Sequence, residues 1–195
     1  MSSLNILSGG AAQGLVASLT AAFEAQTGFD ITGEFGAVGA MADKLRKGTP
    51  TDIVILTAAL VAKLAEEKLV AAGSMADVGL VETALAVRTG DPEAAARDAA
   101  DLREALLASD AIFVPDTKAS TAGIHVANVL QQLGIADEVA TRLRIFPNGA
   151  SAMRELAASE ARRPIGCTQS TEIISTKGVT LSGSLPPGCE LATMY

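Results

Sequence analysis

Four short stretches of small and hydroxyl residues recur at one kind of place, where an apolar run ends and a helical pattern begins. They span residues 8–14, 36–41, 120–123 and 148–151. A helix start carries backbone N–H groups without a partner inside the helix, together with the positive end of the helix dipole. Small side chains leave these N–H groups open to a ligand. The repetition therefore predicts a pocket for a small anion.

Apolar strand patterns alternate with helical patterns along the whole chain. Leu4–Leu7, Asp52–Leu56, Ala111–Val114 and Pro164–Cys167 read as short strands, and amphipathic helices follow them. Alternation at this spacing predicts parallel sheets, in which ligands bind beyond the carboxyl ends of the strands. All four small-residue stretches lie at such ends.

The alternation occurs twice, with extended segments between the two halves. We therefore expect an α/β fold of two lobes, each a mostly parallel sheet flanked by helices, with a ligand cleft between them. The predicted lobes are residues 1–80, with 190–195 returning to this lobe, and residues 83–188. With 195 residues, of which 49% are hydrophobic, the chain is large enough to bury a core.

Charge and hydropathy exclude several partners. The net charge of −7 and the isoelectric point near 4.7 argue against nucleic acid and anionic membranes, which require clustered Lys and Arg. No apolar run is long enough to insert into a membrane, and Met1–Leu7 lacks the features of a signal peptide. We expect a cytoplasmic chain as written, or a periplasmic one if a leader has been removed.

Metal and nucleophile chemistry are also poorly represented. Cys167 and Cys189 are too few for a disulfide framework and are expected to be inert buried thiols. His125 is the only histidine, and we expect a structural role for it. The sequence therefore predicts neither a metal site nor a cofactor. Lys118 and Arg154 are either solvated or balance the charge of a bound carboxylate.

Several segments carry a resemblance to a known family. The chain resembles the molybdate-binding type of periplasmic solute-binding protein over essentially its whole length, through Leu4–Met41, Gly48–Ile55, Val114–Gly123, Pro164–Gly166 and Leu185–Pro187. The resemblance implies the type II periplasmic-binding-protein fold and capture of a small anion between the lobes. It also implies an ABC permease as a partner if the chain is exported.

Three departures from the family pattern concern the ligand. Serines that donate to the oxyanion in molybdate binders are matched here by Ala11 and by the Val38-Gly39 pair, and the tyrosine that closes the family's pocket is matched by Gln169. An oxyanion held without water needs a donor for nearly every oxygen. The resemblance therefore implies a pocket refitted for a ligand with apolar carbon, for which a small organic acid is the simplest candidate.

The candidate ligand-binding residues come from both predicted lobes. They are Ser8, Gly9, Gly10, Ala11, Val38, Gly39, Thr57, Ser120, Thr121, Asn148 and Gln169. Thr57, Ser120 and Thr121 are equally well explained as ordinary N-caps, and Asn148 is also a good N-cap, whereas the amide of Gln169 can orient a carboxylate. Because few cations lie in these loops, we expect backbone N–H groups of residues 9–11, 38–40 and 121–123 to hold the anion.

Two classes of function remain open. The first is a binding protein without enzymatic activity. The second is an isomerase of a small unsaturated carboxylic acid, because aconitate isomerase resembles the same family. Thr57, Lys118, His125 and Glu172 are the available proton donors and acceptors, but no carboxylate pair or Ser-His-Asp set assigns a catalytic residue.

Overall fold

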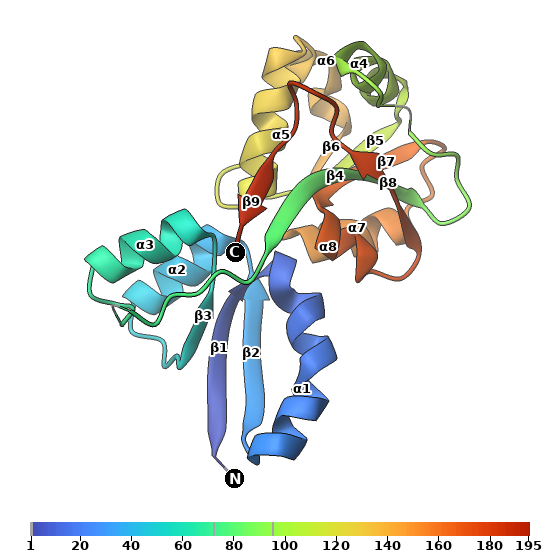
Figure 1. Cartoon of the computed structure of the whole chain (residues 1–195). Coiled ribbons are helices and arrows are strands. Elements are labelled where there is room, and N and C mark those ends of the chain that lie inside the picture. Colours follow the sequence, from blue (N-terminus) through green and yellow to red (C-terminus); the bar gives the residue numbers. More distant parts are fainter. Residues whose placement is uncertain (1, 72, 95) are drawn as a thin grey trace.

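The computed structural model of the 195-residue chain describes residues 2–71, 73–94 and 96–195, which form two α/β lobes (Figure 1). The first lobe carries a three-stranded sheet in the order β2-β1-β3, and both strand pairs are parallel. Its strands are β1 (Ser3–Gly9), β2 (Asp30–Gly36) and β3 (Ile53–Ile55). They are followed in turn by the 3₁₀ turn η1 (Gly10–Ala12) with α1 (Gln13–Thr27), by α2 (Val38–Arg46) and by α3 (Ala58–Glu66). Because the strands are parallel, these helical segments start at one edge of the sheet.

The second lobe carries a larger sheet in the order β6-β5-β7-β4-β8, with β9 also paired to β4. Its strands are β4 (Leu80–Arg88), β5 (Ala111–Pro115), β6 (Leu143–Phe146), β7 (Pro164–Gln169), β8 (Val179–Ser184) and β9 (Ala192–Met194). Its helical segments are α4 (Ala99–Ala108), α5 (Thr121–Gln132), α6 (Ala136–Val139), η2 (Ala140–Arg142), α7 (Gly149–Ala158) and α8 (Ser170–Ile174). β5 is parallel to β6 and β7, whereas β4 is antiparallel to β7, β8 and β9. Only β4 therefore runs against the common strand direction.

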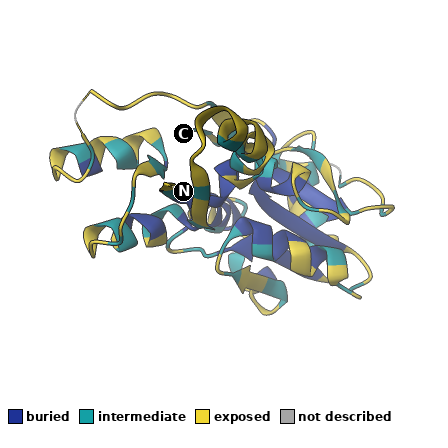
Figure 2. Cartoon of the chain, turned by 90° about the horizontal axis from the view of Figure 1, so that it is seen from below, coloured by how far each residue is buried: buried dark blue, intermediate teal, exposed yellow. Residues whose placement is uncertain are grey.

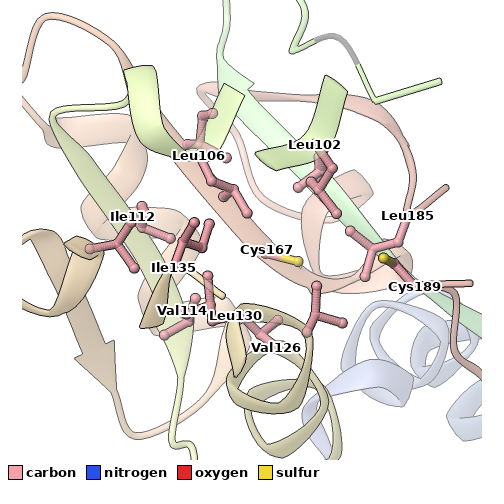
Figure 3. Close-up of a cluster of buried hydrophobic side chains, with 14 residues drawn as sticks. Leu102, Leu106, Ile112, Val114, Val126, Leu130, Ile135, Cys167, Leu185 and Cys189 are labelled. Atoms are coloured by element: carbon pink, nitrogen blue, oxygen red, sulfur yellow. The ribbon is translucent and has the colours of Figure 1, made fainter. Parts of the chain in front are cut away.

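The buried residues concentrate in the second lobe (Figure 2). One apolar cluster packs between the sheet and α4, α5 and α6, and it contains Leu102, Val126, Leu130 and both cysteines (Figure 3). A second cluster includes Met153 and Leu156 of α7. On α5, Val126, Val129 and Leu130 are buried, as expected for an amphipathic helix that packs on a sheet.

The long helix of the first lobe differs from the usual pattern. Its apolar stripe is largely exposed, at 43% for Leu15, 56% for Leu19 and 36% for Phe23. The helix contacts β2, which is the edge strand of a narrow sheet. A three-stranded sheet offers too little surface to cover the whole stripe. Gly28, with φ of 74°, ends the helix in the left-handed conformation, as its position predicts.

The connection between the lobes uses β4 and β9. The first residues of β4, Leu80–Glu82, pair with β9, and the following residues pair with β7 and β8. The boundaries at residues 80, 83 and 188 stay a prediction. Among the described residues, no helix is both long enough and apolar enough to span a bilayer.

Candidate functional site at the junction of the two lobes

The lobes touch where helix starts from both of them meet. η1 of the first lobe packs against α7 and α8 of the second. A second contact joins the start of α2 to the loop before α5, where the Gly39 N–H donates to the Ala119 carbonyl at 3.2 Å. Two predicted ligand stretches of the first lobe, residues 8–14 and 36–41, therefore lie against the second lobe.

Glu172 lies at the first of these contacts. Its side chain is only 4% exposed, and the Thr168 hydroxyl donates to its carboxylate at 2.6 Å. Backbone N–H groups of Gly149, Ala150 and Gln169 lie beside the same carboxylate and favour its charged form. Burial raises the pKa of Glu172 above its ordinary value, and these hydrogen bonds only partly offset the effect of burial. The chain's own carboxylate thus occupies the start of α7, one of the predicted anion sites.

Two glycines make room for this carboxylate. A Cβ atom at Gly10, in the first lobe, would overlap the Glu172 carboxylate, and a Cβ atom at Gly149 would overlap both Glu172 and the Thr168 hydroxyl. Asn148, beside Gly149, caps α7 with its side chain, which accepts from the Ser151 N–H at 2.8 Å. At Asn148 the structure therefore shows the N-cap alternative.

From the sequence, Glu172 was predicted only as a proton donor or acceptor, and its place at the helix starts was not predicted. A signal was present, because Glu172 is the third residue after the N-cap of α8, Gln169. A glutamate there commonly reaches back to the backbone N–H of the N-cap, as it does here.

Tyr195 was also missed as a site residue. A Cβ atom at Gly9 would lie 3.1 Å from the Tyr195 ring and 2.8 Å from Val38, so the ring packs against the end of β1. The Tyr195 hydroxyl lies beside Thr121 at the start of α5, and burial raises the pKa of the phenol above its ordinary value. Tyr195 therefore connects Gly9 of the first lobe to Thr121 of the second.

The remaining candidates either form contacts with their own neighbours in the chain or lie at helix starts that no side chain caps. Ser8 is fully buried, and its hydroxyl donates to the Gly9 carbonyl at 2.9 Å. Ser120 and Thr57 are the N-cap residues of α5 and α3, and neither side chain forms a capping hydrogen bond. Ala11 is buried in η1. The starts of α2 and α5 therefore keep backbone donors that no side chain caps.

Gln169 has the most unusual environment of the predicted residues. Its side chain is 3% exposed, and neither its amide nitrogen nor its amide oxygen has a hydrogen-bond partner among the described residues. Buried polar atoms usually have partners, so an unpaired amide beside a helix start indicates that something else satisfies it.

Other chemistry is weakly represented in the described part of the chain. No group of three or more His, Cys, Asp or Glu side chains is arranged to hold a metal there. The His125 ring nitrogen Nε2 lies 2.7 Å from the Cys189 carbonyl, as a structural histidine would. Burial raises the pKa of the Cys167 thiol to about 12, so this thiol is protonated and a poor nucleophile.

Two cavities lie away from the helix starts. A cavity of about 880 Å³ follows the outer edge of β3 and reaches Tyr195. A smaller one of about 420 Å³ lies in the second lobe, beside α4 and the end of β4. None of the predicted ligand residues lines either cavity.

Comparison with known protein families assigns the chain to one of them. The model of the bacterial extracellular solute-binding proteins matches residues 4–194. The chain belongs to this family. The family match and the two-lobed fold confirm the resemblance found in the sequence.

The individual proteins to which this chain is similar are distant from it in sequence. Aconitate isomerase of a Pseudomonas species is 23% identical over 203 residues, which cover 100% of this chain and 74% of that protein. The periplasmic molybdate-binding protein of Azotobacter vinelandii superposes with a TM-score of 0.76 at 17% identity, over 98% of this chain and 84% of that one. The substrate-binding domain of a putative molybdenum ABC transporter from Clostridium difficile gives 0.62 at 16% identity, over 100% and 85%. At these identities the structural matches show the fold alone.

Proposed function

We propose that this solute-binding protein captures a small anion at the junction of its lobes, with a small organic acid as the preferred ligand. The observation that carries the proposal is the meeting of helix starts from both lobes beside Gly9, Gly39 and Thr121. Such starts offer N–H donors and a positive potential without any charged side chain. The family match supports the same role.

The Glu172 carboxylate limits the positions at which the ligand can bind. The Glu172 carboxylate already lies against the start of α7 at Gly149, so it takes the place of an anion there. The ligand then uses the starts of η1, α2 and α5, in agreement with the predicted donors at residues 9–11, 38–40 and 121–123. Gly39 would exchange its bond to Ala119 for a bond to the ligand.

The preference for an organic acid over an oxyanion rests on missing hydroxyl donors. Ala11, Val38 and Gly39 offer none, and the Ser8 hydroxyl is bound to the Gly9 carbonyl. A tetrahedral oxyanion would lose several charge-assisted hydrogen bonds, each of about 1.5–3 kcal/mol. An organic acid needs fewer donors, because part of its surface is apolar carbon.

Isothermal titration calorimetry on the purified protein tests this proposal. Molybdate and tungstate are expected to bind at least about tenfold more weakly than the best di- or tricarboxylate, a difference of about 1.4 kcal/mol. Tight molybdate binding without a response to a panel of organic acids would overturn the preference. A lack of binding to both classes would overturn the proposed function itself.

The proposed partner and compartment also rest on the family match. Solute-binding components deliver their ligand to a membrane permease, so an ABC permease is the proposed partner. The extracellular role named for the family supports a place outside the cytoplasm. Fractionation of the native host with an antibody against this chain tests the compartment, and pull-down with a neighbouring permease tests the partner.

A second candidate function is isomerisation of a small unsaturated carboxylic acid, as in aconitate isomerase. The buried Glu172 carboxyl favours it, because a base at the junction would remove a proton from one carbon of the acid and return it to another. Proton NMR of cis-aconitate with the protein distinguishes the two functions. A binding protein leaves the substrate unchanged, whereas conversion to the trans isomer that is lost in Glu172→Gln would establish the enzyme.

A further inference from the structure

A group of buried polar side chains in the second lobe has no hydrogen-bond partner among the described residues. The atoms are the hydroxyl oxygens of Thr83, Thr171 and Thr193 and both amide atoms of Gln169. Thr83 is 1% exposed and Gln169 is 3% exposed. Native proteins rarely leave such groups unpaired, because water satisfied them before folding.

Three of these residues share one face of the sheet. Thr83 of β4 lies directly opposite Gln169 of β7, and Val81, two residues before Thr83, lies opposite Thr193 of β9. Residues opposite each other in an antiparallel pair, and residues two apart in a strand, project from the same face. Thr83, Gln169 and Thr193 therefore form one row, which we call the polar row.

The polar row lies at the end of the sheet that faces the first lobe. The next pair along β4 and β7 on this face is Leu85 and Cys167, which belongs to the apolar core of the second lobe. In the other direction the row continues to Tyr195, whose backbone pairs with Gly79 and whose ring packs against Gly9. The apolar core thus gives way to polar groups where the ligand is proposed to bind.

The chemistry of the polar row is uncharged. Gln169 offers an amide donor and an amide acceptor, and each threonine hydroxyl offers both roles. The ionisable groups placed next to it are Tyr195, at the end of the row, and Glu172, on the helix that follows Gln169; both are acidic. A second carboxylate of the ligand would lack a positive partner here, whereas a hydroxyl group is small, neutral and able to donate and accept.

We infer that Thr83, Gln169 and Thr193 form a subsite for an uncharged hydroxyl group of the ligand, so that the ligand is a small hydroxy acid. Its carboxylate binds the starts of η1, α2 and α5, and its hydroxyl group reaches the polar row. This inference rests on the proposed function and specifies the class of organic acid. Because Thr83 and Gln169 are closed off from solvent, access to the row requires an opening at this end of the sheet.

Pairs of acids that differ only by a hydroxyl group test the subsite by calorimetry. The pairs are malate with succinate and lactate with propionate. The wild-type protein is expected to bind at least one hydroxy acid about tenfold more tightly than its partner, which corresponds to about 1.4 kcal/mol. In Thr83→Val and in Gln169→Met, variants of nearly the same shape, this ratio is expected to fall to about twofold or less. The affinity for succinate or propionate should stay within a few-fold.

Thr180→Val is the matched control, because Thr180 is an exposed threonine of the same sheet. Thermal unfolding without ligand provides a second measurement. Thr83→Val is expected to keep or gain stability, since it removes an unpaired buried hydroxyl. A lack of hydroxyl preference, or a preference that survives both variants, would overturn the subsite. A loss of stability in Thr83→Val without any change in preference would show a structural water there. If no acid of either kind binds, the proposed function fails instead.

Discussion

Gly10 of the first lobe lies directly against the Glu172 carboxylate of the second, without room for a Cβ atom between them. This contact joins a turn that follows β1 to a carboxylate that also lies beside backbone N–H groups at the starts of α7 and α8. The relative position of the lobes therefore depends on the lack of a side chain at Gly10 and on the carboxylate of Glu172.

Gly10→Ala is expected to destabilise this closed arrangement. The added methyl group must displace a buried carboxylate that the Thr168 hydroxyl holds, and overpacking of this kind costs about 1–3 kcal/mol. Urea unfolding measures the change. Gly79→Ala is the control, because a Cβ atom there meets nothing within 4 Å. Equal stability of the two variants would contradict the contact.

The stability of the protein is expected to depend on pH through Glu172. Because burial raises the pKa of Glu172 in the folded state, the folded protein binds more protons than the unfolded chain between the ordinary and the raised pKa. Stability is therefore lost as the pH rises through this window and is constant above it.

Urea unfolding of the wild type and of Glu172→Gln across this pH range tests the assignment. The glutamine variant cannot titrate at this position, so the stability of the wild type relative to the variant should fall as the pH rises. A relative stability that increases with pH would show that the hydrogen bonds, rather than burial, determine the pKa of Glu172.

Tyr195→Phe is expected to lower the free energy of unfolding by about 0.5–1.5 kcal/mol, because it removes the hydroxyl group that lies beside Thr121 and leaves the ring against Gly9 in place. Thr121→Val removes the other hydroxyl group of this contact. A double-mutant cycle checks the assignment: if the two effects add fully, the two hydroxyl groups do not interact.

Much of the fold was predictable because local patterns and tertiary packing agree. The strand predicted at Pro164–Cys167 is β7, and the amphipathic helix expected after the strand at Ala111–Val114 is α5, with Val126 and Leu130 buried. The pattern failed at α1, where an apolar stripe that normally indicates a core face is exposed. Periodicity identifies the helix, but it carries no information about the width of the sheet beneath it.

The site was only partly predictable. Small residues at strand ends identify the helix starts, and Gly9, Gly10 and Gly39 all lie at the junction. The partners of those starts come from distant parts of the chain, as Glu172 and Tyr195 do. The capping position of Glu172 in α8 does not reveal its contact with Gly10, and the place of Tyr195 depends on the pairing of its backbone with Gly79.

The final prediction concerns how the charge of the ligand is held. Gly39→Pro removes the N–H donor at the second position of α2, within the first turn, where proline is tolerated. A helix start contributes about 0.3–1 kcal/mol and up to ~2 kcal/mol when partly buried. Several starts with charge-assisted bonds therefore approach the ~8 kcal/mol of a micromolar complex. We expect Gly39→Pro to weaken binding of the best organic acid at least about tenfold.

Three control variants separate this mechanism from a salt bridge. Gly39→Ala adds a Cβ atom but keeps the N–H group, so it should bind more tightly than Gly39→Pro. Lys118→Ala and Arg154→Ala remove exposed cations, and we expect them to change the affinity only a few-fold. Calorimetry on folded variants measures all four dissociation constants. If either cation variant abolishes binding while Gly39→Pro leaves it nearly unchanged, a side-chain charge holds the anion, and the backbone mechanism is wrong.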